Sequence, residues 1–207
     1  MNEIMIARIL YPVRALGPGK RIGIWLCGCN RRCQNCANPE LQAFDGNKKI
    51  RIDDAAESLK ALLHSKPVDG ITISGGEPFE QTKELNALLS AVGEKMPEDI
   101  LIFTGYTIEE LRDRNDPFTD EVLLYASVII DGDYKEELNT GNVLRGSDNQ
   151  RIHILKATYE DRYSKYINTG KRLYESFSTP EGVFMIGLHE KGFRKKLDEQ
   201  KSKHGLI

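Results

Sequence analysis

The pattern of apolar and polar residues predicts strands and amphipathic helices that alternate through the middle of the chain. Apolar residues three and four positions apart share one face of a helix, and short continuous apolar runs are typical of buried strands. A helix capped by Asp53 has an apolar face made by Ala55, Leu59, Leu62 and Leu63. Further helices are expected after Pro78 and over residues 107–114, 158–175 and 191–203. The predicted strands cover residues 3–13, 21–26, 69–74, 99–104, 127–131, 151–155 and 182–188.

This order of elements predicts an α/β fold built on a parallel sheet with crossover helices. Ligands of such sheets collect at the carboxyl ends of the strands. Four loops follow predicted strands at such ends, namely residues 27–36, 75–78, 104–106 and 131–133. We therefore expect these four loops to converge on one pocket.

The size and charge of the chain narrow the classes of function. With 207 residues, it fits one domain that buries a core without disulfides. The 29 basic and 31 acidic residues give a formal net charge of -2, which argues against nucleic acid or an anionic membrane as the main partner. The N-terminal residues lack the apolar stretch of a signal peptide, and no run is long enough to span a bilayer. We therefore expect a cytoplasmic protein.

All four cysteines lie within ten residues, at Cys27, Cys29, Cys33 and Cys36. Cytoplasmic thiols stay reduced, so such a group is more typical of a metal site than of disulfides. The last three have the spacing C-x3-C-x2-C, which lets one short loop hold a cubane iron–sulfur cluster while one iron stays without a protein ligand. That open iron is where chemistry can take place.

Cys27 stands apart because it continues a predicted strand, where a buried thiol packs as a small apolar side chain. Two other roles remain open for it. It would be the fourth ligand of an electron-transfer cluster, or part of a zinc site that all four cysteines close.

A second motif, Gly75-Gly76-Glu77-Pro78, follows a later predicted strand. Adjacent glycines let the backbone approach a ligand closely, and a nearby acid favours an ammonium donor. Pro78 by itself also suits an ordinary helix start. Together with the cysteine spacing, the motif resembles the radical S-adenosylmethionine (SAM) superfamily.

The resemblance implies an open, partial parallel β/α barrel over residues 1–160. Residues 161–207 then form a C-terminal extension that packs on this domain or continues it. The resemblance also implies a [4Fe-4S] cluster on Cys29, Cys33 and Cys36. The SAM contacts that it implies are Asn35, Ala37, Gly75, Gly76, Glu77, Pro78 and Asp131.

Further segments extend the resemblance from about Ile9 to Leu155. They are residues 17–21, 38–41 and 130–132, the turn Phe103-Thr104-Gly105-Tyr106 with the residues after it, and the hexapeptide Arg145-Gly146-Ser147-Asp148-Asn149-Gln150. Together they resemble the family of anaerobic ribonucleotide reductase activating proteins.

Membership of that family implies reductive cleavage of SAM to methionine and a 5′-deoxyadenosyl radical, which then takes a hydrogen atom from a glycine of a partner protein. The implied partner is a glycyl-radical enzyme, with the catalytic subunit of anaerobic ribonucleotide reductase as the leading choice. A low-potential electron donor such as flavodoxin is implied as well. Reduction of a sulfonium needs a cluster potential at the low end of the range, which reaches about -700 mV.

Several polar residues near the predicted pocket have two interpretations each. Asp131 would bind the ammonium or ribose of SAM, or start a turn. Tyr106 would line the adenine side of the pocket, or pack over the sheet end. Arg145, Asn149 and Gln150 would grip a substrate or partner, or hold their own loop together. Arg31 and Arg32 would offset cluster charge or face a docking partner, or form a plain solvated pair.

Three departures from the family keep other functions open. Ala37 stands where the family commonly has an aromatic residue, so any adenine contact at this point has to come from main chain or another side chain. The extra Cys27 is unusual for the family, and the tail beyond about Tyr159 matches no part of it. One alternative is a radical SAM enzyme that acts on its own small-molecule or peptide substrate, with the tail as a lid. The other is a non-catalytic metal-binding module of four cysteines.

Overall fold

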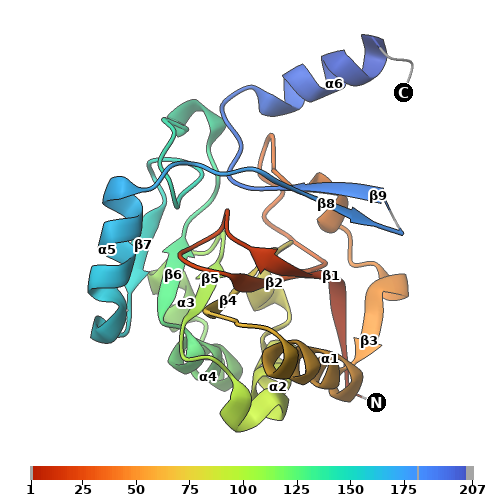
Figure 1. The fold of residues 1–207 in the computed structure, drawn as a ribbon, viewed down its shortest axis with the longest axis vertical. Helices are drawn as coiled ribbons and strands as arrows, with labels where there is room; N and C mark the ends of the chain where they lie inside the picture. Colours follow the sequence, from red (N-terminus) through yellow and green to blue (C-terminus); the bar gives the residue numbers. More distant parts are fainter. Residues whose placement is uncertain (1, 181, 204–207) are drawn as a thin grey trace.

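The computed structural model describes residues 2–180 and 182–203, which form a seven-stranded sheet and a separate two-stranded hairpin (Figure 1). The strands are β1 (Glu3–Val13), β2 (Arg21–Leu26), β3 (Lys49–Arg51), β4 (Gly70–Gly75), β5 (Ile100–Phe103), β6 (Val128–Asp131), β7 (Arg151–Ile154), β8 (Glu175–Thr179) and β9 (Gly182–Ile186). The α-helices are α1 (Ile52–Ser65), α2 (Thr82–Val92), α3 (Ile108–Asp113), α4 (Pro117–Tyr125), α5 (Glu160–Thr169) and α6 (Phe193–Lys203). Short 3-10 helices are η1 (Pro39–Leu41), η2 (Gly46–Lys48), η3 (Pro78–Glu80), η4 (Gly93–Lys95), η5 (Glu136–Leu138) and η6 (Ala157–Tyr159).

The large sheet has the strand order β3-β1-β2-β4-β5-β6-β7, and its centre is parallel. The pairs β2–β4, β4–β5 and β5–β6 run parallel, which confirms a mixed α/β fold. The pairs at both edges are antiparallel, so the prediction of a parallel sheet is wrong there. Between β1 and β2 the chain turns back through Pro18 and Gly19, and this link is too short for the crossover that a parallel pair needs.

Several predicted elements differ from the observed ones. The helix predicted over residues 158–175 ends at Thr169, before Gly170, and Glu175 already begins β8. The strand predicted over residues 182–188 exists as β9 but pairs with β8 outside the large sheet. The helix α4 was not predicted, although Asp116 caps it by accepting hydrogen bonds from two backbone N–H groups. None of the helices in the described residues has the length and apolar character that crossing a bilayer requires.

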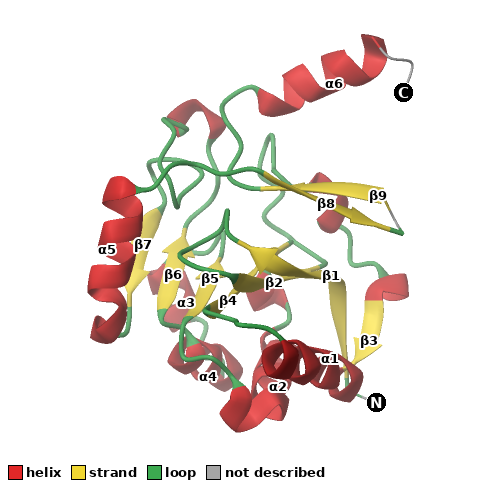
Figure 2. Cartoon of the chain, in the orientation of Figure 1, coloured by secondary structure: helices red, strands yellow, loops and turns green. Residues whose placement is uncertain are grey.

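Both faces of the sheet are buried because side chains of the central strands alternate between two apolar layers. Ile22, Ile24 and Leu26 of β2 point to one layer, which α1, α2 and α4 complete. Trp25 points to the opposite layer and packs near Ile186 of β9. Figure 2 shows α1, α2 and α4 grouped on one side of the sheet and the hairpin β8–β9 on the other.

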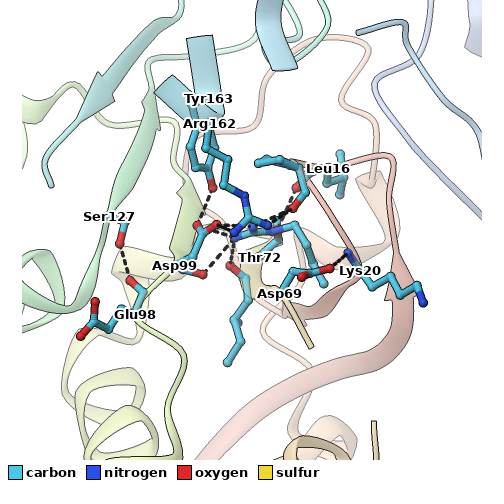
Figure 3. A network of polar contacts seen from close by, with 12 residues as sticks. Leu16, Lys20, Asp69, Thr72, Glu98, Asp99, Ser127, Arg162 and Tyr163 are labelled. Carbon is cyan, nitrogen blue, oxygen red and sulfur yellow. Dashed lines mark hydrogen bonds and ion pairs between the residues drawn. The ribbon is translucent and has the colours of Figure 1, made fainter. Parts of the chain in front are cut away.

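The helix α5 covers the rest of this second face through its fully buried side chain Tyr163. Its hydroxyl donates a hydrogen bond of 2.7 Å to Asp99, which precedes β5 (Figure 3). Arg162 of the same helix lies 3.4 Å from the Asp99 carboxylate. The segment after Leu155, where the resemblance to the family ends, is therefore anchored to the core of the sheet.

Asp99 is also the partner of Arg21, the first residue of β2, whose side chain is completely buried. Two guanidinium nitrogens of Arg21 donate to the two carboxylate oxygens at 3.0 and 3.1 Å. The third nitrogen of the guanidinium, Nε, donates to the Thr72 hydroxyl at 2.7 Å. Because Arg21 and Asp99 lie at the amino ends of their strands, this ion pair stands at the end of the sheet opposite to the four loops described next.

Candidate functional site

One cavity lies at the carboxyl ends of the parallel strands and opens to solvent. Its lining includes Cys29, Gly76, Thr104 and Gly132, which come from the four strand-end loops that the sequence predicted to converge. The rest of the wall comes from the Arg145–Gln150 region and from the C-terminal segment 185–194. The structure therefore brings the predicted loops together and adds a segment that the prediction did not include.

The cysteine loop leaves β2 and turns back on itself through residues with positive φ. Gly28 has φ 91°, and Arg32 and Asn35 have φ 52° and 56°. Asparagine tolerates this left-handed region better than most residues. The start of the loop is pinned by backbone hydrogen bonds from Gly28 to Leu41 and from Cys29 to Gln42, at 2.8 and 3.0 Å. These contacts present the three predicted ligands to the cavity.

The donor set of the loop fits an iron–sulfur cluster. Cys29, Cys33 and Cys36 all line the cavity. Backbone N–H groups of Arg31 and Arg32 near Cys29, and that of Tyr134 near Cys33, favour the thiolate form of these side chains, which is the form that binds iron.

The free thiols are held as weak acids. Burial raises the pKa of Cys29, and burial together with the Asp133 charge raises the pKa of Cys33 to about 11. Metal binding requires the thiolate, so the charge of bound iron has to reverse this preference and displace the protons.

Cys27 has a different environment from the other cysteines. Its side chain is 2% exposed and lies in the apolar layer with Trp25 and Leu41. Its backbone N–H donates to Met5 at 3.0 Å, so it extends the β1–β2 pairing by one position. Cys27 is not among the described residues that line the cavity. This placement favours the interpretation of Cys27 as a buried packing residue.

A zinc site closed by all four cysteines would need the four sulfurs around a single ion. In residues 2–180 and 182–203, no three His, Cys, Asp or Glu side chains are grouped in that way. Three thiolates that bind three different irons of a cubane do not have to meet at one point. The arrangement therefore suits a cluster better than a single zinc ion.

The glycine motif holds the cysteine loop from the β4 side. The N–H of Gly76 donates to Leu26 and that of Glu77 donates to Gly28, both at 2.8 Å. A Cβ on Gly76 would lie 2.3 Å from the carbonyl oxygen of Gly28 and 2.8 Å from that of Leu41. A glycine is needed at this position because the cysteine loop passes directly over it.

This packing gives a prediction for the Gly76→Ala variant. The methyl group meets backbone atoms that have little room to move, so the residues that lead into Cys29 are displaced. Overpacking of this kind costs about 1–3 kcal/mol, a factor of about 5 to 150 in affinity if it falls on the ligand site. We expect lower iron content after anaerobic reconstitution and weaker SAM binding, measured by iron analysis and titration calorimetry.

The matched control is Gly46→Ala, because nothing lies within 4 Å of the Cβ that it would add. Gly46→Ala should retain wild-type iron content and SAM affinity. A Gly76→Ala variant that matches it in both would refute the contact between the two loops.

Glu77 is buried, with 1% of its surface exposed, and it acts as a clamp between loops. One oxygen of its carboxylate accepts from the N–H of Phe79 and the Thr104 hydroxyl, at 3.0 and 2.8 Å. The other accepts from the N–H of Gly105 at 2.7 Å. Burial raises the pKa of Glu77 to about 7, although these three donors oppose the rise. Glu77 therefore fixes the loop after β5 against the glycine motif, on the wall of the cavity.

The side chain of Arg31 is not freely solvated, as it would be if Arg31 and Arg32 were a plain surface pair. Its guanidinium donates twice to the Asp133 carboxylate, at 2.7 and 2.6 Å, and lies 4.8 Å from the centre of the Tyr106 ring. Arg114 approaches the same ring at 4.9 Å. Arg32, in contrast, is exposed. Sequence reasoning missed Asp133 as a site residue, although it follows β6 and lies 3.6 Å from the Cys33 sulfur.

Tyr106 packs over the sheet end and does not line the cavity. Its hydroxyl donates to Glu80 at 2.5 Å, and burial raises the pKa of this phenol to about 12. These contacts favour the packing interpretation over an adenine contact. Asn35 and Ala37 do line the cavity, and the Asn35 amide donates to Glu136 at 2.7 Å. Gly75 and Pro78 lie behind the wall, since only Gly76 and Glu77 of the motif line it.

The Asp131 carboxylate is turned away from the cavity. It accepts from the N–H of Ile108 at 2.9 Å and from the Arg151 guanidinium at 2.5 Å, and it lies 2.9 Å from Nε2 of His153. Its side chain is 1% exposed. Asp131 therefore lies at a junction between β6, β7 and α3, where the Ile108 N–H and the Arg151 guanidinium donate to it, and this placement favours its structural interpretation.

The hexapeptide Arg145–Gln150 holds its own loop together. Arg145 donates to the carbonyl of Gln150 at 3.0 Å, and Gln150 accepts from the N–H of Gly146 at 2.8 Å. Two side chains then reach the loop after β6, as Gln150 donates to Gly132 at 2.9 Å and Asn149 to Asp133 at 2.7 Å. These contacts favour the self-supporting interpretation, and Gln150 alone of the three predicted residues lines the cavity.

Comparison with known proteins identifies a matching family and several similar proteins. Residues 15–153 match the family described as a 4Fe-4S single cluster domain. An anaerobic ribonucleoside-triphosphate reductase-activating protein of Enterobacteria phage T4 is 34% identical over 147 residues, which are 69% of this chain and 90% of the phage protein. The protein of the same name from Vibrio cholerae is 30% identical over 151 residues, 69% of this chain and 94% of its own length.

A pyruvate formate-lyase-activating enzyme of Clostridium pasteurianum is also similar. It is 34% identical over 140 residues, which are 64% of this chain and 55% of the clostridial protein. The shorter relatives align over nearly their whole length, and about 30% of this chain extends beyond them. The family match ends at residue 153, before α5.

Proposed function

Since the chain belongs to the family of anaerobic ribonucleoside-triphosphate reductase-activating proteins, with a 4Fe-4S single cluster domain, we propose that it generates a glycyl radical on a partner enzyme by radical SAM chemistry. The partner we propose is the catalytic subunit of anaerobic ribonucleotide reductase. The observation that carries the proposal is the cavity at the sheet end, where three cysteines of one loop face the glycine motif while Cys27 is packed elsewhere.

The proposed cofactors are a [4Fe-4S] cluster and SAM. When they are bound, they supply the electron transfer that cleaves SAM and the 5′-deoxyadenosyl radical that takes a hydrogen atom from a glycine of the partner. The ligands in this proposal are Cys29, Cys33 and Cys36.

The residues of the chain have positioning tasks. Gly76 allows the backbone to approach a ligand closely, and Glu77 keeps the neighbouring loop of Gly105 in place. Arg31 joins the cysteine loop to Asp133 through a paired ion contact. The apolar side chains Leu16, Trp25 and Phe103 line part of the cavity. Holding the reacting groups in a fixed geometry is the main contribution that a protein makes to such chemistry.

We also propose that the sheet is an open, partial β/α barrel of the radical SAM type. Its parallel strands follow the chain order β2, β4, β5 and β6, and α1, α2 and α4 all pack in one layer beside them. Such winding is typical of a barrel that stays open at its edges. An open side would admit a loop of the partner protein. The proposal includes a cytoplasmic location and a low-potential electron donor such as flavodoxin.

The test is the appearance of a radical on the partner. The anaerobically reconstituted protein is reduced, mixed with SAM and with the ribonucleotide reductase subunit, and followed by electron paramagnetic resonance. We expect a protein-based radical on the subunit, together with 5′-deoxyadenosine, and no radical when the glycine that stores it is replaced by alanine. Formation of 5′-deoxyadenosine without a radical on any glycyl-radical enzyme would contradict the proposal and favour a substrate of another kind.

A further inference from the structure

The C-terminal segment 185–194 forms one wall of the cavity that holds the cysteines. Leu188, His189 and Phe193 line it together with Cys36 and Ala37 of the cysteine loop. This wall lies beyond residue 153, where the family match ends, so it is an addition of this chain to the site that its relatives share.

The wall contains stacked aromatic rings. The His189 ring is stacked on Phe193, with ring centres 4.0 Å apart and planes 4° from parallel. It is also stacked on Tyr174, at 5.9 Å and 5°. Phe193 and His189 line the cavity, whereas Tyr174 lies outside the lining, so the stack faces the cavity with its Phe193 end. Such a stack suits one more flat ring.

The wall is held in position by hydrogen bonds to its backbone. Arg172 donates to the carbonyl of His189 at 2.8 Å, and it donates from its other nitrogens to Asn142 and Arg145, at 2.7 and 3.1 Å. Asn139 donates to the same His189 carbonyl at 2.8 Å. The residue before α6 is held as well, since the N–H of Gly192 donates to Glu136 at 3.0 Å. The stack is therefore fixed before any ligand arrives.

We propose that the wall formed by Leu188, His189 and Phe193 holds the adenine ring of SAM, with Phe193 as the stacking surface. This inference rests on the proposed function, because it assigns a subsite for the cofactor of that reaction. It supplies the aromatic contact that Ala37 cannot give from the cysteine loop.

The test measures binding to the cluster-loaded, oxidised protein by titration calorimetry, so that no turnover is needed. SAM is titrated first, and 5′-deoxyadenosine and methionine are then used as competitors. Removing an aromatic ring that stacks on a base weakens binding by about 5- to 150-fold. We expect Phe193→Ala to weaken SAM and 5′-deoxyadenosine by this factor and to leave methionine unchanged.

Two further variants separate stacking from packing. Phe193→Leu keeps an apolar side chain without a flat face, and it should lose affinity for 5′-deoxyadenosine nearly as much as Phe193→Ala. Phe193→Tyr keeps the ring and should restore it. The matched control is Phe184→Ala in β9, since Phe184 lies outside the cavity lining and its ring is covered by Arg8, 4.1 Å away.

Unchanged SAM affinity in Phe193→Ala and Phe193→Leu, with normal binding to the wild type, would overturn the subsite and leave the proposed function standing. An equal loss for methionine and 5′-deoxyadenosine would also overturn it, since the wall would then act on the whole site. If the wild-type protein with its full iron content binds no SAM, the proposed function itself fails.

Discussion

Cys33→Ala should retain no reductive cleavage of SAM, whereas Cys27→Ala should retain nearly all of it. Cys33 is one of the three proposed ligands that line the cavity. Without its thiolate, one iron loses its protein ligand and the cluster is not retained. The expected result is 5′-deoxyadenosine below detection and iron content well below that of the wild type, in anaerobic assays with dithionite.

Cys27→Ala is the matched control because it removes the same atom from the same stretch of chain. The side chain of Cys27 is buried in an apolar layer, so its truncation leaves a small cavity and costs about 1 kcal/mol of unfolding free energy. Iron content and the rate of SAM cleavage should stay at wild-type levels. Loss of the cluster in Cys27→Ala would show that this thiol is a ligand and would remove the open iron from the mechanism.

Asp99→Asn should lower the free energy of unfolding by about 3–5 kcal/mol, because it leaves the buried Arg21 guanidinium without its counter-charge. Arg21 is 0% exposed and Asp99 is 2% exposed, so water cannot replace the lost partner. The same change removes the charge that Arg162 faces and alters the hydrogen bond from Tyr163. The measurement is urea unfolding followed by circular dichroism, with both variants at the same pH.

The control for Asp99→Asn is Glu57→Gln, which makes the same exchange of carboxylate for amide in an exposed pair with Lys60. Such surface pairs contribute about 0–1 kcal/mol, so the control should unfold almost as the wild type does. If Asp99→Asn costs no more than Glu57→Gln, the buried pair does not hold α5 and the sheet together in the way described above.

The sequence predicted the centre of the fold well because its signals there are local. The apolar runs of β4, β5 and β6 and the amphipathic periods of α1 and α2 are visible in short windows. The edges were harder, since the antiparallel direction of β7 depends on the path of residues 132–150 and leaves no periodic signal. The structure of the tail was the hardest to predict. In the part of the chain that the structure describes, β8 and β9 pair with each other alone, and their position depends on contacts with strands far away in the sequence.

The same distinction applies to the site. The sequence predicts the cysteines and Gly76 as site residues from their spacing, and the structure places Cys29, Cys33, Cys36 and Gly76 in the lining of one cavity. The role of Asp131 could not be decided from the sequence. An acid at a strand end gives the same pattern whether it faces a cavity or, as here, Arg151 and His153. The pairing of Arg31 with Asp133 joins residues far apart in the chain, so only the folded structure reveals it.

The most direct test of the central claim is the electron paramagnetic resonance spectrum of the singly reduced cluster in the wild-type protein, recorded before and after addition of SAM. If three cysteines hold the cluster and one iron is open, SAM binds that iron and the spectrum changes. A four-iron cluster whose spectrum is the same with and without saturating SAM would contradict the account.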